Sequence, residues 1–96
     1  MTDLNSIRHI LTQLKPELIE KYHISSIGLF GSIVRDDYNS SSDIDIIVEF
    51  SQPIGIEFID LADFIEKKLD STVDLVSKNG VKEKYYRSIQ SEIIYV

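Results

Sequence analysis

The sequence predicts a small α/β (α+β) domain in which one mixed β-sheet is flanked by helices. Short, largely apolar runs, at 24–30, 43–50 and 72–76, alternate with segments whose apolar residues recur at helical spacing. The 96 residues suffice for one hydrophobic core and leave little room for a second lobe. We therefore expect a single domain over residues 1–96.

Composition and charge narrow the classes of function. The chain has no cysteine, which excludes disulfides and thiolate metal sites and suits a reducing cytoplasm, the location that we expect. It has no apolar run long enough to cross a bilayer and no signal-peptide pattern, so we expect no membrane association. A net charge of -6 argues against direct binding of nucleic acid, because such binding depends on basic residues that neutralise phosphates.

The N-terminal segment has the pattern of an amphipathic helix. Asp3 is a suitable N-cap, and Pro16 is expected to break the helix, so that residues 17–22 form a second helical piece. The apolar residues at helical spacing are Leu4, Ile7, Ile10, Leu11 and Leu14. We interpret this segment as a packing helix without a chemical role.

Two strands and the turn between them are expected next. Residues 24–30 form the first strand, residues 32–36 a short helix and residues 37–42 a loop. The second strand, at 43–50, is apolar on both faces after Asp45, which is typical of a central position in a sheet.

The C-terminal half should add two helices and one or two strands. A turn at 51–55 precedes a helix at 56–69, and a third strand at 72–76 precedes a last helix at 81–91. The apolar tail, residues 93–96, either docks on the domain or adds an edge strand. The expected core stripe of the helix at 56–69 comprises Phe58, Ile59, Ala62, Ile65 and Leu69.

Asp43 and Asp45 are the first candidate site residues. Alternation along a strand places both on one face, ~6.6 Å apart at Cα, while Ile44 points to the other face. Two carboxylates this close repel one another, and a divalent cation between them removes the penalty. The alternative is that Asp43 caps a loop and Asp45 is a strand-end carboxylate in water.

Asp74 is the third candidate because it stands among four β-forming residues in the run TVDLV. An ionised carboxylate within such a strand is costly unless it is paired or binds a metal. If this strand lies beside the strand at 43–50, the three carboxylates converge on one patch of the sheet. The alternative is an edge strand with Asp74 facing solvent.

Gly31 and Ser32 follow the first strand at a turn that is suited to phosphate. Glycine lets a phosphate approach the backbone, and free N–H groups at a helix start favour an anion. The Ser32 hydroxyl can donate to a phosphate oxygen, and Arg35, one turn later, adds a guanidinium on the same side. The alternative is an ordinary strand-to-helix turn capped by Ser32, with Arg35 as a surface charge.

These pieces, GLFGSIVRDDYNSSSDIDIIVEF followed by VDLV, resemble the minimal nucleotidyltransferases of the DNA polymerase beta superfamily. In that superfamily Gly-Ser is followed after about ten residues by Asp-x-Asp and later by a third Asp on another strand. The resemblance covers nearly the whole chain, from the N-terminal helix to the ending EIIYV. It implies the nucleotidyltransferase fold and one minimal nucleotidyltransferase domain.

The resemblance also implies a role for each motif residue. Asp43 and Asp45 would hold two Mg²⁺ ions, and Asp74 would bind the metal that activates the attacking hydroxyl. Gly31 and Ser32 would hold the triphosphate of ATP, with a phosphate role for Arg35 as well. Two metal ions can clamp the attacking and leaving oxygens of an in-line displacement at phosphorus.

Small stand-alone chains of this kind resemble the antitoxins of HEPN/minimal-nucleotidyltransferase toxin–antitoxin pairs. The resemblance implies transfer of AMP from ATP to a tyrosine hydroxyl of a cognate HEPN-type toxin. One alternative is a non-catalytic antitoxin that neutralises the toxin by masking it. Another is nucleotidyl transfer to a small molecule, although the chain lacks the extension that would bind an antibiotic.

Overall fold

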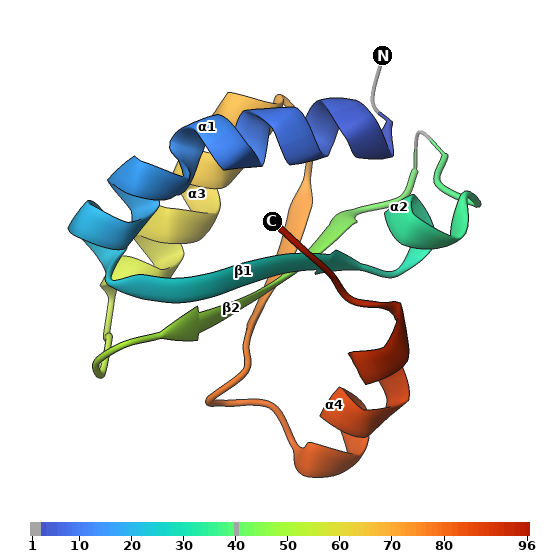
Figure 1. Cartoon of the computed structure of the whole chain (residues 1–96). Coiled ribbons are helices and arrows are strands. Elements are labelled where there is room, and N and C mark those ends of the chain that lie inside the picture. The colour runs from blue at the N-terminus through green and yellow to red at the C-terminus, as the bar shows by residue number, and fades with distance from the viewer. Residues whose placement is uncertain (1–2, 40) are drawn as a thin grey trace.

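The computed structural model describes residues 3–39 and 41–96, and in them a four-stranded sheet lies between two helical layers (Figure 1). Helices α1 and α3 cover one face of the sheet, and α4 covers the other. The elements are α1 (Leu4–Tyr22), β1 (Ile24–Phe30), α2 (Ser32–Arg35), β2 (Ile44–Phe50), α3 (Glu57–Leu69), β3 (Val73–Ser77), α4 (Glu83–Ile89), the 3-10 helix η1 (Gln90–Glu92) and β4 (Ile94–Tyr95).

The sheet is mixed, with strand order β3-β2-β1-β4. Strand β1 pairs antiparallel with β2 and with β4, whereas β2 pairs parallel with β3. The predicted α/β class, the central position of β2 and the edge-strand alternative for the C-terminal tail are all confirmed. The expected loop at 37–42 also lacks helix and strand where it is described, while Ser40 lies outside the described residues.

Helix α1 runs without interruption through Pro16, so the predicted break was wrong. Leu11 and Leu18, on either side of the proline, are both fully buried in the same core. Burying a leucine side chain contributes ~1.5–3 kcal/mol, and two such residues offset a helix-interior proline, which costs about 3 kcal/mol. The predicted cap is confirmed, because Asp3 Oδ1 accepts a hydrogen bond of 2.8 Å from the Ser6 N–H.

The predicted core stripe of helix α3 is confirmed at Ile65 and Leu69, which are buried, and at Phe58, which is partly buried against the core, but it is wrong at Ile59. Leu61, Ile65 and Leu69 are buried, whereas Ile59 is 62% exposed. At 100° per residue Ile59 lies beside the stripe rather than within it, and Leu61 takes its place. The helix itself occupies the predicted segment to within one residue.

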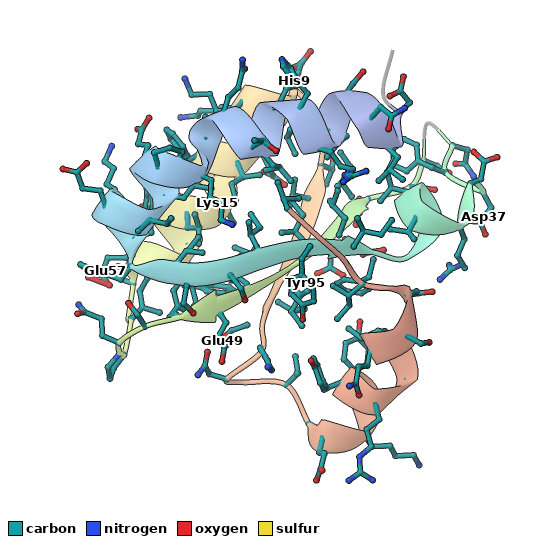
Figure 2. The ribbon with its side chains drawn as sticks, in the orientation of Figure 1. His9, Lys15, Asp37, Glu49, Glu57 and Tyr95 are labelled. Atoms are coloured by element: carbon teal, nitrogen blue, oxygen red, sulfur yellow. The ribbon has the colours of Figure 1, made fainter. Side chains whose placement is uncertain are left out.

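The C-terminal segment closes the sheet on the open side of β1. Helix α4 ends at Ile89, and η1 continues it to Glu92, so the predicted helix at 81–91 divides into two pieces. The carbonyl oxygen of Val96 accepts a hydrogen bond of 2.7 Å from Lys15 Nζ, and Figure 2 shows Lys15 on α1. In residues 3–39 and 41–96, no helix is long and apolar enough to cross a membrane.

Candidate active site

Asp45 and Asp74 lie side by side on neighbouring strands. They are direct partners in the parallel pairing of β2 and β3, so their side chains leave the same face of the sheet. Asp45 is half-buried, and Asp74 is exposed. Asp43 is exposed and immediately precedes β2. The structure places β3 beside β2, the condition on which the prediction depended, and so brings the third predicted acid next to the Asp-x-Asp pair.

The Asp45 carboxyl is the electrostatic centre of this cluster. Burial raises the pKa of Asp45 to about 6, and the negative charges of Asp74 and Asp43 act in the same direction. The positive charge of Arg35 opposes the rise in pKa. Asp43, Asp74 and Arg35 are thus all within electrostatic reach of Asp45, and the excess of acids attracts cations.

The three carboxylates supply the oxygen ligands that Mg²⁺ prefers. As the side chains stand in the described residues, no three acidic or histidine side chains are gathered closely enough to hold a metal ion. Asp43 and Asp74 are exposed, and exposed side chains change rotamer within nanoseconds. The donor set therefore fits a hard divalent cation, and its final arrangement requires side-chain rotation.

Gly31 fills the turn between β1 and α2, where only glycine fits. Its φ is 78°, in the region that favours glycine, and a Cβ atom there would collide with the Asp45 carboxylate. The turn is therefore packed directly against the acidic cluster. This contact places the predicted phosphate turn and the predicted metal ligands in one site.

Ser32 begins α2, which has a single turn, so the helix dipole contributes little to binding an anion. The backbone N–H groups of Val34 and Arg35 already donate to the Gly31 carbonyl oxygen at 3.0 and 3.1 Å. Within the described part of the chain, the Ser32 hydroxyl has no hydrogen-bond partner. Binding of an anion here would rest on this hydroxyl and on the Arg35 guanidinium.

Glu92 is a site residue that sequence reasoning missed. Its Oε1 accepts a hydrogen bond of 3.0 Å from the Gly31 N–H, and Arg35 Nη1 lies 3.3 Å from both of its carboxylate oxygens. The side chain of Glu92 is 24% exposed. Nothing in the spacing of residues 31 and 92 joins them. The only available signal was the predicted pairing of the C-terminal tail as an edge strand.

Tyr85 is a second unpredicted neighbour of the acidic cluster. Its ring meets Phe30 edge-on, with 6.5 Å between the ring centroids, and Phe30 is the cross-strand partner of Asp45. Burial raises the pKa of the Tyr85 hydroxyl, and the charges of Asp45, Asp74 and Glu92 add to the rise. The side chain of Tyr85 is 43% exposed, and it lies within electrostatic reach of the acidic cluster.

Comparison with known proteins agrees with this geometry, since the model of the nucleotidyltransferase domain family matches residues 11–96. The chain belongs to this family. The nucleotidyltransferase is 39% identical to protein adenylyltransferase MntA of Thermococcus cleftensis, over all of this chain and 98% of the relative. It is thus a homologue of a protein adenylyltransferase along its whole length.

Solved structures show the same fold. A candidate minimal nucleotidyltransferase superposes with a TM-score of 0.82, at 24% identity, over 97% of this chain and 95% of the other. A chain of a toxin–antitoxin complex with AMP-PNP matches with a TM-score of 0.70, at 26% identity, over 95% of this chain and 69% of the other. The mixed sheet and its helices are therefore those of the nucleotidyltransferase fold.

Proposed function

We propose that this nucleotidyltransferase transfers AMP from ATP, in the presence of Mg²⁺, to a tyrosine hydroxyl of a cognate HEPN-type toxin, and that it acts as the antitoxin. The observation that carries the proposal is the packing of Gly31 against Asp45, with Asp74 beside it. The turn that would bind phosphate therefore lies directly against the pair of acids that would bind the metal. The relative named protein adenylyltransferase and the toxin–antitoxin complex with AMP-PNP support the same chemistry and kind of partner.

Each candidate residue has a distinct role in this proposal. Ser32 and Arg35 bind the polyphosphate of ATP next to the Gly31 backbone, and Asp43, Asp45 and Asp74 hold Mg²⁺. The bound cation supplies neutralisation of the phosphate charge and of the charge that develops during transfer. The acids thus attract the cation, and Ser32 and Arg35 attract the polyphosphate.

The chemical step is an in-line displacement at the α-phosphorus of ATP. The tyrosine oxygen forms a bond to this phosphorus, the bond to the oxygen that bridges to the β-phosphorus breaks, and pyrophosphate leaves. The exposed Asp74 carboxylate accepts the proton of the tyrosine hydroxyl. Transfer thus requires that the tyrosine hydroxyl of the acceptor can reach the exposed Asp74 carboxylate.

The proposal is tested with labelled ATP, Mg²⁺ and the purified product of the adjacent gene. We expect label on the partner, and we expect its rate of appearance to fall by ~10²-fold or more in Asp43→Asn and Asp45→Asn, as for loss of other electrostatic groups at active sites. Asp63→Asn is the matched control, because Asp63 is an exposed acid on α3, away from the site. It should transfer label at the wild-type rate.

The same variants distinguish catalysis from masking. If Asp45→Asn transfers no label and still fully protects cells from the toxin, neutralisation by masking is the better explanation. Label on an added small molecule, with none on the partner protein, would contradict the proposed acceptor.

A further inference from the structure

The C-terminal edge strand brings an acid to the nucleotide site. Strand β4 pairs with β1 through Gly28–Tyr95 and Leu29–Ile94. Continuing this register by two positions places Glu92 opposite Gly31, where its carboxylate accepts the Gly31 N–H at 3.0 Å. The acid thus reaches the turn from the side of β1 opposite to β2.

Glu92 and the acidic cluster lie on different sides of Gly31. The N–H of Gly31 points to Glu92, whereas its Cβ position would point into the Asp45 carboxylate. Since the Ser32 hydroxyl is left without a partner among the described residues, a phosphate can be bound there while Glu92 keeps its hydrogen bond. Glu92 therefore does not have to leave when a nucleotide arrives.

Glu92 also fixes the position of Arg35. The Arg35 guanidinium lies 3.3 Å from both Glu92 oxygens, and it is close enough to Asp45 to lower the pKa of that carboxyl. A long arginine side chain loses conformational freedom when it binds a phosphate, and an acid that holds it beforehand reduces this loss. Gly31 is buried, so its N–H also needs the partner that Glu92 supplies.

We propose that Glu92 is a positioning residue of the nucleotide site, which holds the Gly31 turn and aims Arg35 at the polyphosphate of ATP. The inference rests on the proposed function only in assigning this turn to phosphate. The C-terminal segment would then contribute to nucleotide selectivity. A prepositioned Arg35 increases the affinity for a triphosphate more than the affinity for a monophosphate.

The test compares the affinities for ATP and AMP, measured by calorimetry with Mg²⁺ on the full chain. We expect the preference for ATP over AMP to fall about tenfold in Glu92→Ala and about threefold in Glu92→Gln, which keeps an acceptor but loses the charge. Arg35→Gln should lower the preference at least as much as Glu92→Ala. The double variant Arg35→Gln/Glu92→Ala should lower it no further than Arg35→Gln alone.

Glu83→Gln is the matched control for charge. It removes one acid from an exposed Arg–Glu pair on α4, so it changes the net charge by the same amount without touching the turn. Its preference for ATP should equal that of the wild type. A purely structural role of Glu92 would lower the melting temperature and leave the preference unchanged.

Three results would overturn the inference. The first is that folded Glu92→Gln prefers ATP over AMP as strongly as the wild type does. The second is that this variant binds ATP more tightly than the wild type, which would mean that Glu92 competes with phosphate. The third applies if the Glu92 variants do not fold. Arg35→Gln should still fold because the Arg35 side chain is exposed, and an unchanged preference for ATP over AMP in this variant would then contradict the inference. The proposed function is tested separately: a chain that prefers ATP through Glu92 but labels no partner keeps this inference and loses that function.

Discussion

The two faces of the sheet are made by the same strands but bury very different amounts of apolar side chain. In the described residues, fifteen buried apolar residues form the core between the sheet and helices α1 and α3. Only three, Phe30, Ile47 and Ile89, form the buried cluster under α4. The acids Asp45 and Asp74 leave the sheet on this second face, beside the small cluster.

The face under α1 and α3 thus provides most of the stability, and the face under α4 carries the candidate active site. The core under α1 and α3 is apolar throughout, with no buried polar or charged residue among those described. The α4 face holds like charges together, and partial burial, together with the charges of Asp74 and Asp43, raises the pKa of Asp45 there. A domain of this size can tolerate such a cluster because the other face supplies most of the hydrophobic stabilisation.

The largest effect on folding should come from truncating the core under α3. Leu61 is fully buried, so Leu61→Ala should lower the free energy of unfolding by ~2–5 kcal/mol. Ile59→Ala on the exposed side of the same helix should change it by less than ~0.5 kcal/mol. Urea denaturation measures both. Since Leu61 lies on the face opposite to the acids, the KM for ATP of folded Leu61→Ala should equal that of the wild type.

Gly31→Ala should lower both the stability of the fold and the rate of AMP transfer, because the substitution lies where the turn meets Asp45. The positive φ and the collision with the Asp45 carboxylate predict a loss of ~1–3 kcal/mol in the free energy of unfolding. Transfer of AMP should be lost as the turn and the carboxylate move apart. Gly55→Ala is the control, because its Cβ would meet only the Glu57 carboxylate, at 3.7 Å. A fully active Gly31→Ala would show that the turn does not hold phosphate.

Asp45 should make the metal-free protein less stable as the pH rises. Its pKa is about 6 in the fold against 3.8 in the unfolded chain, so the folded state binds more protons between these values. Its unfavourable contribution is absent below about pH 4 and complete above about pH 6. In EDTA, Asp45→Asn should therefore melt at a higher temperature than the wild type at pH 7.5, with a smaller difference at pH 4.5. Equal differences at the two pH values would contradict this.

The strands and the acidic pair could be predicted because their signals are local. Each of the three predicted strands is a short, largely apolar run, and the apolar character of residues 46–48 on both faces indicated a central strand. A central β2 needs a neighbour on each side, which brought Asp74 next to Asp45. Pro16 was misjudged because the proline rule is also local, whereas the burial of Leu11 and Leu18 that overrides it is tertiary.

Glu92 and Tyr85 could not be placed from sequence for the same reason. Both belong to the C-terminal segment, whose position depends on the pairing of β4 with β1 and on the packing of α4 against Phe30. No periodicity or spacing encodes these contacts, which join residues 61 and 55 positions apart in the chain.

The smallest effect on the free energy of unfolding should come from breaking the Arg87–Glu83 ion pair, although it is shorter than the Arg35–Glu92 pair at the candidate site. Arg87 Nη2 lies 2.6 Å from Glu83 Oε1, but the two side chains are 72% and 76% exposed. Water screens such a pair, so Glu83→Gln should lower the free energy of unfolding by only ~0.2–0.5 kcal/mol, an effect that added salt removes. The Arg35–Glu92 pair is longer, at 3.3 Å, yet Glu92 is only 24% exposed. If exposure outweighs distance, thermal melts of Glu92→Gln will show a larger loss than those of Glu83→Gln, and the opposite ranking would mean that contact length decides.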